Sequence, residues 1–104
     1  MREKEVEQCL VRSVKQVGGI ALKFVSPGMA GVPDRILLFP RGRIAFAELK
    51  APGKVMRPLQ KHRKEQLERL GFTVCCVDHI EQIPEILRKI IGPEMAHKNG
   101  GDEG

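Results

Sequence analysis

The first part of the chain alternates apolar and charged positions with the period of an α-helix. At ~100° per residue, the apolar positions fall within one arc and the charged positions fall on the other side. The apolar arc consists of Val6, Leu10, Val11, Val14 and Val17. Two glycines, Gly18 and Gly19, end the pattern, as glycines commonly do at the end of a helix. The pattern therefore predicts an amphipathic helix that packs on a core.

Three glutamates near the start of this helix differ in their position relative to the apolar arc. Glu7 lies inside the arc, Glu3 lies near its edge, and Glu5 lies on the polar side. A carboxylate on the buried side of a helix requires a cation, a metal ion or a water-filled cleft beside it. Glu7 is therefore the first candidate for a functional acid in this helix, and Glu3 and Glu5 are its rivals.

Four short apolar runs predict β-strands. They are residues 20–25, 34–39, 43–50 and 72–77. A helix is expected between Pro58 and Gly71, and another from Pro84. Because the second and third strands are apolar on both faces, we expect them at the centre of a mixed sheet covered by helices. The sequence thus predicts an α/β fold, order α-β-β-β-α-β-α, in one domain over residues 1–91, and a disordered tail over 92–104.

The connection between the second and third strands, "FPRGR", predicts how these strands pair. Its proline suits a type I turn, and its glycine suits the left-handed position of a three-residue loop. Phe39 then pairs with Arg43, and counting back along both strands places Asp34 opposite Glu48. A two-residue loop would instead place the two acids on opposite faces. Lys50 shares the face of Glu48, so two acids and an amine are expected together.

Two opposed carboxylates indicate a metal site. Directly opposed residues have Cβ atoms ~4.5 to 5.5 Å apart, and like charges there repel unless something positive lies between them. Hard oxygen ligands at this separation suit Mg²⁺, which also takes waters and substrate phosphate. With the nearby amine, such a site is suited to phosphodiester hydrolysis. Each residue alone has a simpler explanation as a turn or strand-edge residue, so the prediction depends on their combination.

The charge of the chain indicates a polyanionic partner. The formal net charge is +5, and residues 50–64 hold six Lys or Arg and no acid. With no Trp, no Tyr and four Phe, contacts to phosphate are expected rather than stacking on bases. A solvated cationic face is the alternative. The candidate contacts are first Lys54 and Arg57, then Arg35, Lys61, Arg63, Lys64 and Ser26, which begins the loop "SPGMAGVP".

The cysteines and the N-terminus argue against an extracellular or membrane protein. Cys9, Cys75 and Cys76 are odd in number and lack C-x-x-C spacing, so neither a disulfide nor a zinc site is expected. They are expected to be small buried hydrophobes in a reducing cytoplasm. The N-terminus is charged, and no apolar run approaches the about 18 residues of a membrane span. We therefore expect a cytoplasmic protein without a signal peptide or anchor.

Three segments together resemble a known nuclease family. The segments "GVPDRI" and "AELKAPG", followed by Gln60 in "PLQKHRKEQLERLG", are similar to the VRR-NUC domain of the PD-(D/E)xK superfamily. The resemblance covers residues 5–91 and extends to archaeal Holliday junction resolvases. It implies a restriction-endonuclease-like core, in which a four-stranded mixed sheet lies between helices. This is the element order that the apolar pattern predicts.

The resemblance also implies roles for particular residues. Asp34 and Glu48 are the expected metal ligands, together with the main-chain carbonyl of Leu49. Lys50 is the expected catalytic lysine, and Gln60 is the expected glutamine that orients this lysine or a phosphate. In related resolvases a glutamate of the first helix also lies near the metal, and Glu7 takes that position here.

The expected protein is a magnesium-dependent endodeoxyribonuclease of bacterial or phage origin, with Mn²⁺ as a substitute metal. Its expected substrate is branched DNA such as a Holliday junction, in repair or recombination. We expect a homodimer, because symmetric cleavage requires two sites related by a two-fold axis. The alternatives are a nuclease that prefers flaps, duplex or single strands, and a nucleic-acid-binding module without hydrolysis. A nucleotide-using enzyme is not supported, since no G-x-x-x-x-G-K-[ST] segment is present.

Overall fold

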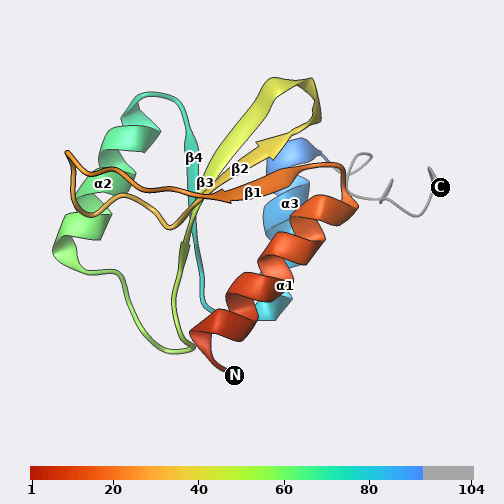
Figure 1. Ribbon diagram of the computed structural model, residues 1–104, viewed down its shortest axis with the longest axis horizontal. Coiled ribbons are helices and arrows are strands. Elements are labelled where there is room, and N and C mark those ends of the chain that lie inside the picture. The colour runs from red at the N-terminus through yellow and green to blue at the C-terminus, as the bar shows by residue number, and fades with distance from the viewer. Residues whose placement is uncertain (93–104) are drawn as a thin grey trace.

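The computed structural model describes residues 1–92, and its elements follow the predicted order (Figure 1). The helices and strands are α1 (Glu3–Gln16), β1 (Ile20–Lys23), β2 (Arg35–Phe39), β3 (Arg43–Leu49), α2 (Pro58–Arg69), β4 (Thr73–Val77) and α3 (Ile83–Ile91). Two short 3-10 turns are η1 (Pro40–Gly42) and η2 (Ile80–Gln82). The expected tail lies outside the described residues, apart from Gly92. The predicted fold class is confirmed.

The four strands form one mixed sheet in the order β1-β2-β3-β4. Strands β1, β2 and β3 pair antiparallel, and β3 pairs parallel with β4. A parallel pair requires a long crossover connection, and α2 provides it here. The two strands of the predicted hairpin are therefore central, as their apolar character on both faces indicated.

The predicted register of the hairpin is confirmed. Phe39 pairs with Arg43, and the ladder runs back to the pair of Arg35 with Ala47, one step before the two acids. The expected turn is wrong in one detail, because Arg41 has a φ of 68° and lies in the left-handed region beside the glycine that follows it. The predicted register is nevertheless correct, because it depends only on the number of loop residues. That number is three in the predicted turn and in the observed turn.

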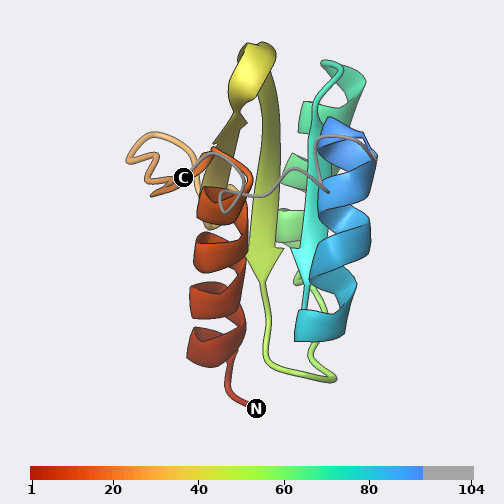
Figure 2. The ribbon, with the colours of Figure 1, turned by 90° about the vertical axis from the view of Figure 1, so that its right-hand side faces the viewer.

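Helices α1 and α3 cover one face of the sheet, which we call the core face (Figure 2). The buried side chains between them are Val6, Leu10, Val14, Val17, Leu37, Phe39, Ala45, Ala47, Leu49, Val77, Ile83, Leu87 and Ile91. Most of the predicted apolar arc of α1 is among them. The chain then enters β1 through Gly19, where a Cβ atom would lie 2.5 Å from the carbonyl oxygen of Leu38. Only glycine allows so close an approach.

Helix α2 lies on the opposite face, which we call the site face, and packs beside β4 (Figure 1). Gln60 is the one residue of α2 that is buried. Five element ends differ from the sequence prediction by one or two residues. Strand β1 ends at Lys23 rather than residue 25, and β3 ends at Leu49 rather than residue 50. Strand β2 begins at Arg35 rather than residue 34, β4 begins at Thr73 rather than residue 72, and α3 begins at Ile83 rather than Pro84. No helix within residues 1–92 has both the length and the apolar character needed to cross a membrane.

Candidate active site

Glu48 is the centre of the candidate site. It lies on β3, points to the site face, and is only 2% exposed. Its Oε2 atom accepts a hydrogen bond of 2.7 Å from Gln60 Nε2 and lies 3.2 Å from the ammonium of Lys50. Its Oε1 atom is buried and has no hydrogen-bond partner within the described part of the chain. One carboxylate oxygen is therefore held firmly, and the other lacks a partner that such a buried atom normally has.

The surroundings of Glu48 raise the pKa of its carboxyl group. Burial is the largest cause, and the negative charge of Asp34 is the second. The hydrogen bond and charge of Lys50 act in the opposite direction, and the charge of Glu3 adds a smaller increase. The ionised carboxylate is thus under-compensated, so a cation placed between Glu48 and Asp34 would be stabilising.

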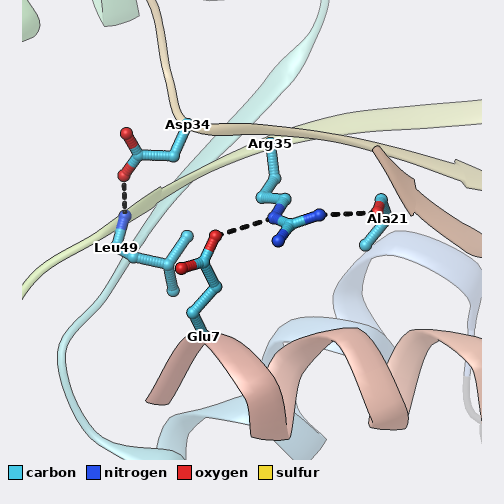
Figure 3. A network of polar contacts seen from close by, with 5 residues as sticks. All are labelled: Glu7, Ala21, Asp34, Arg35 and Leu49. Atoms are coloured by element: carbon cyan, nitrogen blue, oxygen red, sulfur yellow. Dashed lines mark hydrogen bonds and ion pairs between the residues drawn. The ribbon is translucent and has the colours of Figure 1, made fainter. Parts of the chain in front are cut away.

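Asp34 is fixed at the point where β2 begins. Its Oδ2 atom accepts a hydrogen bond of 2.8 Å from the main-chain N–H of Leu49, at the end of β3 (Figure 3). Its carbonyl oxygen accepts a second bond of 2.9 Å from the N–H of Phe24. Asp34 therefore lies beside the end of β3 that carries Glu48. The family resemblance implied a role only for the carbonyl of Leu49. In the structure, the N–H of Leu49 is the group that holds the carboxylate of Asp34.

Gln60 connects the start of α2 to the site. Its Oε1 atom accepts a hydrogen bond of 2.9 Å from the N–H of Arg57, which precedes the helix. Its Nε2 atom donates to Glu48. Because a carboxylate only accepts and an N–H only donates, the two contacts fix which way the amide points. The resemblance predicted that Gln60 orients a lysine or a phosphate, and the structure places it on the same oxygen that Lys50 contacts.

Glu7 has a cation as its partner. Its Oε2 atom accepts a hydrogen bond of 2.8 Å from Arg35 Nε, and Arg35 also donates to the carbonyl of Ala21 at 3.0 Å (Figure 3). Strand alternation could have indicated only that Arg35, which follows Asp34, points to the opposite face of the sheet. Among residues 1–92, no three Asp, Glu, His or Cys side chains come together to hold a metal. The structure therefore does not bring Glu7 into one ligand group with Asp34 and Glu48.

The rival acids of α1 take other positions. Glu3 is exposed, although its negative charge contributes to the raised pKa of Glu48. Glu5 accepts a hydrogen bond of 2.7 Å from the N–H of Arg2, at the start of the helix. Glu5 thus stabilises the helix end, and Glu3 is the acid of α1 whose charge reaches the site.

The predicted phosphate contacts divide into two groups. Three have exposed side chains and no ion pair within the described residues: Lys54, Arg57 and Lys61. The others make contacts inside the protein. Arg35 binds Glu7, Arg63 donates to the carbonyl of Ala30 at 2.7 Å, and Lys64 lies 2.6 Å from Glu68. Ser26 is half-buried in the loop that Arg63 holds. The first group is therefore better placed to meet a ligand.

Burial makes the two cysteines of β4, Cys75 and Cys76, poor candidates for a nucleophile. All three cysteines are free, and they are half-buried rather than fully buried as expected. Burial raises the pKa of the Cys75 thiol to about 11, so it remains protonated at neutral pH. Burial and the charge of Glu48 raise the pKa of Cys76 as well.

The donor set fits a hard divalent cation. Asp34 and Glu48 supply carboxylate oxygens, and no His or Cys joins them within the described residues. Mg²⁺ commonly binds through one or two carboxylates and takes its other ligands from water and phosphate. The Oε1 atom of Glu48 is the observation that favours such an ion, because it is a buried carboxyl oxygen that has no hydrogen-bond partner among the described residues.

Comparison with known proteins finds one similar chain and one similar solved structure. No protein-family model matches the chain. The chain is 47% identical over 78 residues to "Putative nuclease p44" of Acyrthosiphon pisum secondary endosymbiont phage 1, an alignment that covers 75% of this chain and 84% of that protein. A solved structure described as "VRR_NUC domain" matches with a TM-score of 0.78 and 26% identity, over 83% of this chain and 94% of the other.

Proposed function

We propose that this chain, which belongs to the VRR-NUC family of nucleases, is a magnesium-dependent endodeoxyribonuclease that acts on branched DNA. One observation carries the proposal. Glu48 is a buried carboxylate that Lys50 and Gln60 hold by one oxygen, while its other oxygen is unpartnered and the charge of Asp34 is close. A binding module would gain nothing from this arrangement, since the two like charges only cost stability without a cation.

The proposed reaction is hydrolysis of a phosphodiester bond. Water attacks the phosphorus, one P–O ester bond breaks, and the products are a phosphate end and a hydroxyl end. A divalent cation held by Asp34 and Glu48, Mg²⁺ or Mn²⁺ in its place, would supply positive charge to the phosphate and lower the pKa of water there. In the proposal the carbonyl of Leu49 is a third ligand, and waters and phosphate complete the shell.

Lys50 and Gln60 have separate proposed roles. The ammonium of Lys50 lies 3.2 Å from Glu48. In the proposal its positive charge stabilises the negative charge that develops on the phosphate. Gln60 does not reach the phosphate in this proposal. It holds Glu48 in position from α2, so the ligand does not depend on a flexible rotamer.

The proposed substrate is duplex DNA with a branch, such as a four-way junction. Lys54, Arg57 and Lys61 are the proposed phosphate contacts, because they are exposed and lie in the loop after β3 and on the first turns of α2. Contacts of this kind position the DNA without reading its sequence. Cleavage is therefore expected to depend on DNA shape more than on base identity.

Symmetric cleavage supports a homodimer as part of the proposal. The site face carries exposed apolar residues on neighbouring strands, with Ile20 57%, Leu22 45% and Ile44 41% exposed. Leu38 lies between Ile20 and Ile44 in the sheet, so these side chains form one surface. A second copy of the chain could cover it through a two-fold axis. Light scattering after size exclusion should give a dimer for the wild type and a monomer for Ile44→Lys.

A cleavage panel tests the central proposal. Labelled four-way junction, flap, duplex and single-stranded DNA are incubated with wild type and Glu48→Ala in Mg²⁺, in Mn²⁺ and in EDTA. We expect cleavage by the wild type only with metal, with the junction cut fastest, and none by Glu48→Ala. Absence of cleavage on every substrate, together with salt-dependent binding in EDTA, would instead support a binding module. Equal rates for the two proteins would exclude Glu48 from the chemistry.

A further inference from the structure

A second basic surface lies outside the stretch that the sequence indicated. Helix α1, strand β1 and the first residue of β2 border an open groove of about 380 Å³. The residues that line it are Lys4, Glu7, Gln8, Val11, Arg12, Lys23 and Arg35. Four of them are cationic, and only one is acidic. This groove is separate from residues 50–64, where the excess of positive charge is visible in the sequence.

Three of the four cations of the groove have no acidic partner among residues 1–92. The carboxylate of Glu7 pairs with Arg35, 2.8 Å away. No acid of residues 1–92 forms an ion pair with Lys4, Arg12 or Lys23. The described residues therefore leave an excess of positive charge at the groove, and an anionic ligand would be stabilised there.

The cations of the groove extend along α1. Lys4 and Arg12 lie eight residues apart on the same side of the helix, about 12 Å along its axis, with the neutral side chain of Gln8 between them. Lys23 faces them from β1. Phosphates of one duplex strand follow each other at about 3.4 Å along the axis, so this length matches about three nucleotides. Cations spread over this length fit a sugar-phosphate backbone better than a small anion.

The groove and the candidate active site meet at two consecutive residues of the chain. Asp34 turns toward the end of β3, and Arg35 points the other way, to Glu7, which is one of the residues that line the groove (Figure 3). We propose that the groove binds the sugar-phosphate backbone of the nucleic acid that flanks the cleavage position. This inference rests on the proposed nuclease function, and it adds a binding surface of α1 and β1 to it. The ligand class is a polynucleotide, recognised through its phosphates and not its bases.

Contacts to phosphates that do not react should affect binding and not chemistry. Such contacts are equally strong in the bound substrate and in the transition state, so their loss raises KM and leaves kcat at saturating DNA nearly the same. Each lost phosphate contact should also reduce the slope of log K against log salt concentration by about 0.9 for duplex DNA. The salt slope therefore counts the contacts directly.

Two triple variants with the same change in net charge test the inference. Lys4→Ala/Arg12→Ala/Lys23→Ala empties the groove, and Lys15→Ala/Arg69→Ala/Lys89→Ala removes three exposed cations that do not line it. Binding of fluorescent junction DNA is measured by anisotropy in EDTA across a salt series. We expect the groove variant to bind at least about tenfold more weakly, with a slope reduced by about 2 to 3. The control should differ from wild type by less than about threefold.

Several outcomes would overturn the inference. The groove variant could bind DNA with the affinity and salt slope of the wild type, which would contradict the inference. Equal losses of DNA affinity in the groove variant and the control variant would also contradict it, because they would indicate only general charge attraction. A reduced kcat with an unchanged salt slope would do so as well, because it would place these residues in the chemistry. If the triple variant melts below the assay temperature, Arg12→Gln alone must lower the slope by about 1. Because binding is measured without metal, failure of the wild type to cleave DNA would refute the nuclease proposal and leave this result standing.

Discussion

The two faces of the sheet differ in what they bury. On the core face, Leu37, Ala45 and Ala47 are completely buried beneath α1 and α3. On the site face, the buried residues include a carboxylate and an amide, Glu48 and Gln60, and much of the apolar surface near the hairpin remains exposed. One face therefore resembles an ordinary protein core, whereas the other holds polar groups in a protected position.

Strand β3 shows how closely the two faces are connected. Ala47 and Leu49 point to the core face, while Glu48 and Lys50 point to the site face. A buried carboxylate destabilises the fold, and burial of apolar groups on the other side of the same strand offsets this cost. The core face therefore supports the fold and the site face holds the proposed catalytic groups, so substitutions on the two faces should have different consequences.

The largest expected effect is the loss of cleavage in Glu48→Gln. Loss of a charged ligand and of the contact to Lys50 should lower the cleavage rate at least about 100- to 1,000-fold. Because burial and Asp34 raise the pKa of Glu48, the ionised carboxylate destabilises the folded protein. In EDTA at pH 8, Glu48→Gln should therefore melt at a higher temperature than wild type. A lower melting temperature at pH 8 would contradict the idea that this charge is costly.

The stability gain of Glu48→Gln should depend on pH. A carboxyl group with a raised pKa in the folded state destabilises the protein above that pKa and stops doing so once it is protonated. The difference in melting temperature between the variant and wild type should therefore shrink as the pH falls through the folded pKa. It should disappear below the ordinary value of 4.5. Melting curves at pH 4 and pH 8 in EDTA measure this, and a constant difference would assign the gain to packing.

Leu37→Ala should have the opposite effects, a lower stability and a nearly unchanged cleavage rate. Leu37 is completely buried on the core face, so its truncation should lower the free energy of unfolding by about 2 to 5 kcal/mol. The cleavage rate per folded molecule should change little at a temperature where the variant is folded. Leu38→Ala is the matched control, because Leu38 is the next residue and lies half-buried on the site face. Urea unfolding of both variants measures the decrease in the free energy of unfolding. Equal decreases would mean that the two faces contribute equally to stability.

Gln60→Met should weaken the site without removing it. Methionine keeps the length of the side chain but loses the hydrogen bonds to Glu48 and to the N–H of Arg57. Loss of a group that orients a metal ligand typically costs about 10- to 100-fold in metal affinity or activity. The Mg²⁺ concentration for half-maximal cleavage should rise accordingly. Gln66→Met, on the same helix, is the control. An unchanged Mg²⁺ requirement in Gln60→Met would mean that Gln60 does not contribute to metal binding.

The smallest expected effect concerns the pair of Glu7 and Arg35. Their side chains are 26% and 15% exposed, so the pair is partly screened by solvent. A double-mutant cycle with Glu7→Gln and Arg35→Met should give a coupling energy of about 1 kcal/mol or less. Cleavage by Glu7→Gln should remain within about tenfold of wild type if Glu7 serves mainly as the partner of Arg35. A loss as large as that of Glu48→Gln would instead support Glu7 as a metal ligand.

The sequence predicted those parts of the fold that depend on local rules. The hairpin register follows from the number of loop residues, and a slip by one residue would expose the apolar positions of β2 and β3. The positive φ of Arg41 was not predicted, because a non-glycine residue adopts it only when the surrounding strands require it. The end of β1 was also not predictable, since it depends on where the chain leaves its neighbour.

The candidate site was predicted where strand alternation or the family resemblance fixes a side chain. Asp34, Glu48 and Lys50 follow from the register, whereas the partner of Glu7 depends on how α1 docks on the sheet, which local sequence does not determine. For the same reason, nothing in the sequence indicated that Arg35, a predicted DNA contact, pairs with Glu7. The groove between α1 and β1 could not be predicted, because Lys4, Arg12 and Lys23 come together only after docking.

The compact placement of the candidate site along the chain has a consequence for folding. Asp34, Glu48, Lys50 and Gln60 all lie within residues 34–60, in a hairpin and the helix that follows it. Contacts between near neighbours in sequence form quickly, because little loop-closure entropy opposes them. Docking of α1 and the parallel pairing of β4 join more distant segments and should form later. We therefore expect the two acids to meet before the core face is complete, so that Mg²⁺ should accelerate refolding of the wild type but not of Glu48→Gln.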